Sequence, residues 1–382
     1  MEQDNIEQEP FDGLEAEQEP DSSSLPETIS DPFDPAQIKV SRKVVPISSI
    51  VKRIDHDEID LSPDFQRRAR IWDSVRKSRL IESILLRIPL PVFYVAADYD
   101  ENWKVVDGLQ RITTIYDFIR HESKDSFPLR GLEYLTPYEG ATFNELPRSI
   151  ARRIDETELN VNVIESGTPE PVMFNIFRRL NTGGISLNSQ EIRNALHPGP
   201  VRQFLIELAD EPNFQEATGN GVRDERMGAR ELVLRYCAFH INGFESYAAS
   251  DLDGFLNDSM RQINSMTEKE RESVRADFRE AMYRASLLFG SNAFRKSVRG
   301  QIRRSPINRA LFEAVSVNLS ELSPLELTAL CMDNNILTEK MYQLMEDELF
   351  IRSISLSTGS RQMVLLRFRE INRLFRSIVG DR

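Results

Sequence analysis

The chain has 382 residues, enough for two or three domains at about 150 residues each. Its 40% hydrophobic and 29% charged residues are ordinary for a globular protein, which excludes collagen-like, coiled-coil-only and wholly disordered chains. No run approaches the roughly 18 apolar residues of a membrane span, and the acidic N-terminus is not a secretory signal. Cys237 and Cys331 form no CxxC pair. We therefore expect a cytoplasmic protein that does not engage a membrane.

The net charge of −13 is concentrated at the N-terminus, where residues 1–36 contain twelve acids and no Lys or Arg. Without these twelve acids, 49 acids face 48 bases, so the rest of the chain is nearly neutral. Few large apolar residues and no periodicity predict a disordered acidic tail over residues 1–37. The tail is either a solubilising segment or a nucleic-acid mimic that covers a basic groove.

Alternating helix and strand patterns predict an α/β module over residues 38–200. Asp73 is a suitable N-cap, and Pro89 and Pro91 end the helix that it starts. The expected elements, in chain order, are a helix at 47–54, a strand at 58–61, a helix from 74, strands at 92–96 and 103–106, a helix after Gly108 and a strand at 159–165.

Helical patterns dominate the remainder, and residues 201–382 are predicted to form a mostly helical domain. Ser323-Pro324-Leu325-Glu326 is a capping box with Pro at the first helical position. The fold class expected for the whole chain is therefore α+β. The later helices are expected at 170–180, 188–196, 200–210, 223–241, 268–289, 306–319, 324–332 and 361–379.

The sharpest motif runs from Val105 to Thr114, where an apolar strand ends in Asp107-Gly108 and a helix begins. Glycine allows a close backbone approach, and the free amides at a helix N-terminus suit phosphate. Arg111 can clamp phosphate, Gln110 can orient a water or a base, and Asp107 can hold a metal or act as a base. The alternative is an Asx-type turn with a surface arginine.

The positive charge of Arg111 opposes the helix dipole at this position. We therefore expect an anion or an acid to offset it, and we expect its removal to leave the fold intact.

Two further arginine-rich segments are candidates for nucleic-acid contact. The segment Asp64–Trp72 has three arginines, Arg67, Arg68 and Arg70, between two aromatic residues. This pattern indicates either a loop that faces phosphates or a solvated loop whose aromatic residues pack in the core. Residues 295–309 hold six basic residues and no acid, which indicates either phosphate-backbone contacts or a solvated face.

Several catalytic patterns are missing from the sequence. The four histidines form no HExxH, H-x-H or Cys–His set, and no GxSxG occurs. No P-loop occurs, and the C-terminal half shows no His-Asn-His nuclease constellation. Any phosphodiester cleavage is therefore expected from the α/β module or from another chain.

Taken together and in order, the motifs resemble the N-terminal domain of GmrSD-type restriction enzymes, the domain-of-unknown-function family 262. The resemblance covers residues 45–200 well and the rest loosely. It rests on Phe65-Gln66-Arg67 with Trp72, on LIESILLRIPLP at 80–91, on Val106–Thr114, and on Phe177, Asn181, Gly183, Leu187, Glu191, Arg193 and Asn194.

This resemblance implies a ParB/sulfiredoxin-like fold, a loop at Asp107–Arg111 that grips nucleotide phosphates, and a role in defence against foreign or modified DNA. The family's pentad is usually DGQQR, and here Leu109 replaces the first glutamine. Many relatives carry a His-Asn-His nuclease domain, which this sequence is predicted to lack.

Two functions remain open. The chain is an enzyme that hydrolyses an NTP or nicks DNA with a divalent cation such as Mg²⁺, or it is a non-catalytic nucleotide- or DNA-sensing subunit that acts with a separate nuclease or defence subunit. Homo-oligomers are compatible with both. The predicted site residues are Asp107, Gln110 and Arg111 as catalytic, Asp107 as metal ligand, Gln66, Arg67, Gly108, Thr113, Thr114, Asn181 and Arg193 as nucleotide-binding, and Arg68, Arg70, Arg299, Arg303 and Arg304 as DNA-binding.

Overall fold

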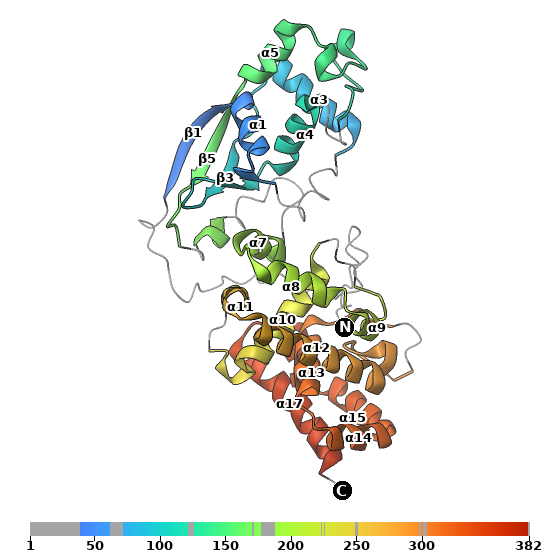
Figure 1. Ribbon diagram of the computed structural model, residues 1–382. Helices are drawn as coiled ribbons and strands as arrows, with labels where there is room; N and C mark the ends of the chain where they lie inside the picture. The colour runs from blue at the N-terminus through green and yellow to red at the C-terminus, as the bar shows by residue number, and fades with distance from the viewer. Residues whose placement is uncertain are drawn as a thin grey trace. The chain divides into compact units, whose positions relative to one another are not determined.

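A computed structural model describes residues 39–61, 72–120, 126–169, 172–176, 188–222, 224, 226–248, 251–297, 299–300 and 304–380 (Figure 1). Its internal contacts divide the chain into two compact units, one ending at Leu187 and one that begins at Asn188. We call them the sheet unit and the helical unit. The predicted acidic tail over 1–37 lies outside the described residues.

The division falls before helix α7 (Ser189–Leu196), whereas the sequence-based boundary falls after it, at residues 200 and 201. Polar contacts tie α7 to the helical unit. Asn188 Nδ2 donates to the Arg226 carbonyl oxygen at 2.8 Å, and Arg193 Nη2 lies 3.1 Å from Asp253 Oδ1. These partners lie far along the chain, so local sequence patterns do not reveal them.

The sheet unit is built on a five-stranded mixed sheet with the order β1-β5-β3-β4-β2. The pairs β1/β5 and β3/β4 are antiparallel, and the pairs β3/β5 and β2/β4 are parallel. The strands are β1 (Val40–Pro46), β2 (Ile59–Asp60), β3 (Phe93–Ala97), β4 (Trp103–Asp107) and β5 (Glu158–Ile164).

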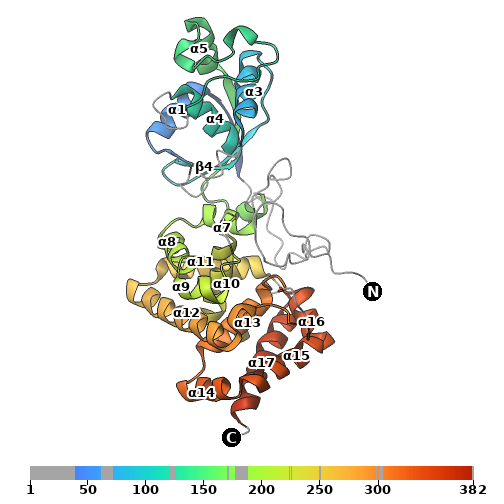
Figure 2. The same cartoon turned by 90° about the vertical axis from the view of Figure 1, so that its right-hand side faces the viewer.

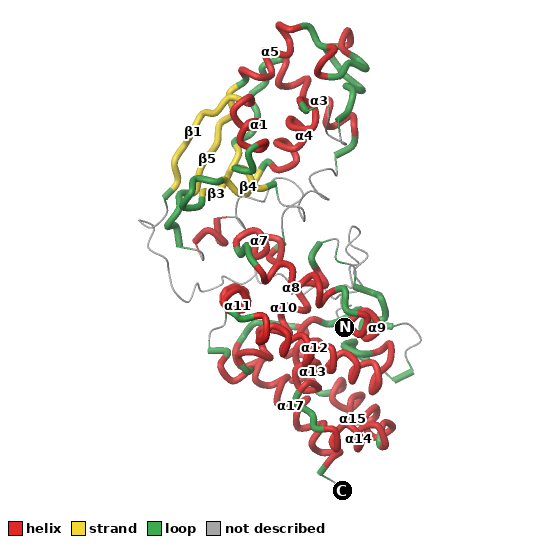
Figure 3. Tube along the Cα trace, viewed as in Figure 1, coloured by secondary structure: helices red, strands yellow, loops and turns green. Residues whose placement is uncertain are grey.

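One face of the sheet packs against helices, which Figure 3 shows in red beside the yellow strands. Along β5, Leu159, Val161 and Val163 are buried, and Asn160 and Asn162 between them are only half-buried, the period of two that a one-sided core requires. The helical segments of this unit are α1 (Ile47–Asp55), α3 (Ser74–Leu85), α4 (Leu109–Ile119), η3 (Thr136–Tyr138), η4 (Phe143–Glu145) and α5 (Arg148–Glu156).

A buried carboxylate in α3 anchors the loop that follows α4. Glu82 is 4% exposed and accepts backbone N–H groups from Glu133 at 3.0 Å and from Tyr134 and Leu135 at 2.7 Å each. Burial raises the pKa of Glu82, but the three N–H groups outweigh it and hold the pKa below its ordinary value. The LIESILL segment therefore carries a structural acid.

The helical unit contains all the remaining elements, and the two views of the ribbon show how they are arranged (Figures 1 and 2). Its core holds Phe214, Phe239, Phe278 and Phe312, each fully buried. Besides α7, the unit consists of α8 (Pro200–Ala209), α9 (Pro212–Ala217), α10 (Gly228–Asn242), η6 (Phe244–Ser246), α11 (Leu252–Ser265), α12 (Glu268–Phe289), η7 (Gly290–Asn292), α13 (Arg309–Ser320), α14 (Pro324–Met332), α15 (Asn334–Glu346), α16 (Glu348–Ser355) and α17 (Arg361–Val379).

Buried charges join three of these helices. Glu313 of α13 is fully buried between Arg367 of α17, with which it pairs, and Arg235 of α10 at 3.4 Å. Arg235 Nη2 also lies 3.0 Å from Glu231, which Arg309 approaches at 3.8 Å. Burial raises the pKa of Glu231, but the neighbouring arginines outweigh it and lower the pKa to about 2. Removing any one of these buried charges would therefore leave its partner buried and unpaired, which destabilises the fold.

The predicted α+β class is confirmed, and the Asp73 cap and the Ser323 capping box are present. Strand β1 was missed because its partner β5 lies more than a hundred residues downstream. Helices α5, α9, α11, α15 and α16 were also missed. Within the described residues, no helix combines the length and apolar character that a bilayer crossing requires.

Replacing Glu82 by Gln tests the anchoring role. The substitution leaves backbone N–H groups of the 133–135 loop without a carboxylate, so we expect a loss of about 2–3 kcal/mol in the free energy of unfolding at pH 7. Because the folded pKa of Glu82 is depressed, its contribution is complete above the unfolded pKa and is lost as pH falls through the folded value.

Urea denaturation at pH 7 and below pH 4 checks both expectations, since the difference between wild type and Glu82→Gln should shrink in acid. Glu139→Gln is the matched control, because Glu139 accepts N–H groups of Gly131 and Leu132 at an exposed position. Equal losses for the two variants at pH 7 would rule out a special role for Glu82.

Candidate functional site

The predicted turn between strand and helix exists as expected. Strand β4 ends at Asp107, Gly108 adopts the left-handed region with φ of 96°, and α4 begins at Leu109. A Cβ atom at Gly108 would lie 2.4 Å from Phe93 Cδ1, a distance that no real contact allows. Both the positive φ and the aromatic ring therefore require glycine here.

The start of α4 is oriented for an anion. The first hydrogen bond inside the helix is from Ile112 N–H to the Gly108 carbonyl oxygen at 2.9 Å. The N–H groups of Leu109, Gln110 and Arg111 precede it and have no intrahelical acceptor, as at every helix start. No acidic residue occupies the first turn. This geometry suits a phosphate group.

Arg111 folds back over the turn. Its Nη2 lies 2.8 Å from Asp107 Oδ2, Nη1 donates to the Pro91 carbonyl oxygen, and the guanidinium lies 4.3 Å from the centre of the Phe93 ring. The side chain is only 12% exposed. Burial lowers the pKa of Arg111, and Asp107 partly restores it.

These contacts supply the acid that the helix-dipole argument required, so the charge of Arg111 is explained without an external ligand. They also revise the expectation that removing Arg111 leaves the fold intact. Loss of the side chain leaves the Pro91 carbonyl oxygen and Asp107 without this donor, and we now expect a moderate destabilisation of about 1–2 kcal/mol.

The other residues of the motif divide between the turn and the core. The Oε1 atom of Gln110 is buried without a partner beside the turn. Thr113 and Thr114 are buried, at 4% and 0% exposure, and Thr113 Oγ1 donates to the Leu109 carbonyl oxygen at 2.9 Å. Neither threonine is exposed to a ligand in this conformation, in contrast to the sequence-based assignment. Their position on the buried face of the second turn of an amphipathic helix explains the burial.

Some predicted site residues lie outside the described residues, and one belongs to the other unit. Trp72 packs against the core of the sheet unit, with the Arg76 guanidinium 4.6 Å from its ring. Arg193 belongs to α7 in the helical unit, where it pairs with Asp253. Those outside the described residues are Gln66, Arg67, Arg68, Arg70, Asn181 and Arg303.

The basic run at 295–309 is largely neutralised within the helical unit. Arg295 is buried and donates to the carbonyl oxygens of Ser305 and Thr218. Arg299 pairs with Glu339 and lies 3.5 Å from Glu346. Sequence alone could not show this compensation, because the acids come from α15. Arg304 is the exposed member of the predicted DNA-binding set that has no ion pair among the described residues.

Metal-binding side chains do not gather at the turn. Among the described residues, no group of three or more His, Cys, Asp or Glu side chains could hold a metal ion. Asp107 offers one carboxylate, of which one oxygen faces Arg111. A Mg²⁺ ion at this position fits only if nucleotide phosphates complete its ligands, the mode that Mg²⁺ commonly uses.

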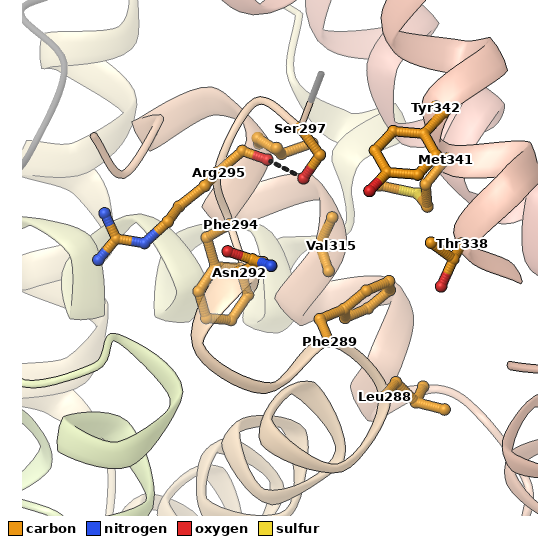
Figure 4. A pocket seen from close by; sticks show the side chains of 11 residues that line it. Leu288, Phe289, Asn292, Phe294, Arg295, Ser297, Val315, Thr338, Met341 and Tyr342 are labelled. Carbon is orange, nitrogen blue, oxygen red and sulfur yellow. Dashed lines mark hydrogen bonds between the residues drawn. The ribbon is translucent and has the colours of Figure 1, made fainter. Parts of the chain in front are cut away.

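A separate pocket of about 560 Å³, partly open to solvent, lies in the helical unit (Figure 4). The Arg295 guanidinium points away from the other lining side chains, toward its carbonyl partners. No other residue in the lining is charged, so the pocket does not match the predicted phosphate chemistry. It is lined by Leu288, Phe289, Asn292, Phe294, Arg295, Ser297, Leu311, Val315, Thr338, Met341 and Tyr342.

By class, the sheet unit is an α+β domain in which an Asp-Gly turn presents the N-terminus of a helix. Residues 47–198 match the model of the family described as GmrSD restriction endonuclease, N-terminal domain. This match agrees with the resemblance that the motifs predicted over these residues. No curated protein matches the chain.

The constraint at Gly108 can be tested by Gly108→Ala. The added Cβ would clash with Phe93, and the alanine would have to adopt a left-handed backbone conformation. We therefore expect the free energy of unfolding to fall by about 2 kcal/mol or more. Gly140→Ala is the control, because Gly140 has φ of 81° but open space around the added atom. Guanidinium denaturation should show a clearly smaller loss for the control, and equal losses would exclude a steric role for Phe93.

Proposed function

We propose that this chain is a nucleotide-binding, DNA-associated protein of a restriction-like defence system, with a ParB/sulfiredoxin-like sheet unit. The GmrSD-type domain at 47–198 supports the defence role. The observation that carries nucleotide binding is the left-handed Gly108, which places the free amides of α4 beside Arg111 and the unpartnered Oε1 of Gln110.

A phosphate group would be held by two kinds of donor. The helix N-terminus supplies N–H groups and a favourable dipole, and the absence of a side chain on Gly108 lets the phosphate approach the backbone. Arg111 lies one helical turn further along, close to Asp107. A phosphate would compete with the Asp107 carboxylate for the guanidinium, since each offers two oxygens to the planar fork of arginine donors.

Hydrolysis would proceed from the same groups. Release of Arg111 toward the phosphate frees Asp107, whose carboxylate would then orient water or hold Mg²⁺ together with the nucleotide. The bound ion would supply charge neutralisation of the phosphates. Gln110, in the first turn of α4, would orient the attacking water.

Non-catalytic sensing by a subunit that signals to a separate nuclease is the second candidate. It is favoured by the contacts that already engage the Arg111 guanidinium, which lies against the Pro91 carbonyl oxygen, the Phe93 ring and Asp107. It is also favoured by Leu109 at the position where the family pentad has glutamine.

Arg111→Ala tests nucleotide binding. Loss of a charge-assisted contact should weaken the binding of the preferred NTP by at least 2 kcal/mol, or about thirtyfold, in calorimetry with Mg²⁺. Arg120→Ala is the matched control, because Arg120 follows the other end of α4 and pairs with Asp55. If no NTP binds the wild-type protein, or if both variants bind equally well, the turn is not a nucleotide site.

Leu109→Gln separates the enzyme from the sensor. Phosphate release and DNA nicking are measured with each NTP and magnesium, with and without DNA. An enzyme should show turnover in the wild-type protein that Asp107→Asn abolishes. A sensor should bind nucleotide without turnover. In that case Leu109→Gln, which restores the glutamine of the family pentad, should give the protein a hydrolysis activity that the wild type lacks. Turnover that persists in Asp107→Asn would exclude the proposed role of this carboxylate.

DNA contact is tested by replacing Arg299, Arg303 and Arg304 together with Gln. We expect weaker binding to all sequences and a salt slope that falls by roughly 0.9 for each lost phosphate contact. Arg299 should contribute least, because Glu339 and Glu346 already face it. Arg373→Gln, at an exposed position of α17, controls for the change in net charge. An unchanged slope would identify the run as a solvated face.

A further inference from the structure

The pocket of the helical unit is lined by residues that share one face of each helix. Leu311 and Val315 lie four residues apart on α13, and Thr338 and Tyr342 have the same spacing on α15. Figure 4 shows the α15 side chains on one side of the cavity and Phe294 on the other. The volume of about 560 Å³ is in the range of small-molecule sites. Every lining residue belongs to the helical unit.

The pocket contains a strained backbone position at Phe294. The φ of this residue is 64°, a left-handed value that is an outlier for a bulky side chain. Its carbonyl oxygen accepts the Asn308 N–H at 2.9 Å, and its ring packs against Phe312 with the ring centres 4.6 Å apart. The next residue, Arg295, donates to the Ser305 carbonyl oxygen at 2.6 Å. Because such strain is concentrated at functional sites, it indicates a preformed ligand pocket.

The charges around the cavity favour an uncharged ligand. The guanidinium of Arg295, the one charged residue of the described lining, is directed away from the other lining side chains (Figure 4). The guanidinium carbon of Arg299 lies 5.8 Å from the centre of the Tyr342 ring. Glu339 and Glu346 both face this arginine, so these surroundings add no net positive charge. A charged ligand would therefore be buried without a counter-ion, which is costly.

The uncharged polar groups of the lining define the hydrogen bonds that a ligand can make. Among the described residues, neither the side-chain amide of Asn292 nor the hydroxyl of Tyr342 has a hydrogen-bond partner. Each of these groups can both donate and accept. The ring of Phe289 and the thioether of Met341 add surfaces that suit an aromatic ring.

We propose that this pocket binds an uncharged, planar aromatic molecule that carries an amide-like group, of which an aromatic carboxamide is the simplest case. The ring packs against Phe289, Phe294 and Met341, and the amide forms hydrogen bonds with Asn292 and Tyr342. This activity is additional to the proposed phosphate binding at the Asp107 turn, which requires an anion.

The test titrates the full chain at pH 7 with indole-3-carboxamide, and with indole-3-carboxylate and indole for comparison, in calorimetry and saturation-transfer NMR. We expect the carboxamide to bind at least tenfold more tightly than the carboxylate, because the carboxylate buries a charge. Indole, which lacks the amide, should also bind more weakly. Tyr342→Phe and Asn292→Leu should each weaken carboxamide binding about fivefold and leave indole binding unchanged.

Neither Tyr342 nor Asn292 is fully buried, so both variants should fold. Tyr283→Phe is the matched control, since Tyr283 is an exposed tyrosine of α12 outside the lining, and it should keep the wild-type affinity. Equal binding of the carboxamide and the carboxylate would overturn the proposal. It would also fail if the carboxamide showed no saturable binding up to its solubility limit, or bound equally well to the wild type, Tyr342→Phe and Asn292→Leu.

Discussion

The backbone at Gly108 is the constraint on which the candidate site depends. Its left-handed conformation turns the chain from β4 into α4 with the Phe93 ring directly against the Cα. This turn brings Asp107 and Arg111 to the same side, four residues apart in the chain. A side chain at this position would displace Phe93, and with it the ring on which the Arg111 guanidinium lies. The local stability, and the phosphate affinity that we propose for this turn, would therefore both depend on the absence of a side chain at residue 108.

Local signals predicted most of the sheet unit. The Asp73 cap, the Asp-Gly break and the spacing of apolar residues in α4 are encoded within a few neighbouring residues, and the structure contains each of them. Strand β1 escaped prediction because it is largely exposed and its hydrogen-bond partners are in β5. The proximity of Asp107 and Arg111 follows from their spacing on the helix start. The hydrogen bond from Arg111 to the Pro91 carbonyl oxygen does not follow from sequence spacing, because it forms only in the folded sheet unit.

Basic residues of the helical unit show the limit of charge patterns. Arg295 and Arg367 belong to segments whose sequence resembles a cationic surface, yet both are buried and donate to carbonyl oxygens or to Glu313. Glu313 in turn forms ion pairs with two arginines, one from α10 and one from α17. Sequence proximity does not reveal such pairs, because each partner lies tens of residues away.

The pairing of β1 with β5 has a consequence for synthesis on the ribosome. Val40 pairs with Ile164, so the first strand of the sheet cannot be paired until the last one has been made. At about 5–20 residues per second, this interval lasts roughly 6–25 s. During it the nascent chain exposes Val40 and Val44 on a strand without its neighbour, a template for unwanted pairing. The strand remains polar until β5 has been synthesised, because Ser41, Arg42 and Lys43 lie between these valines.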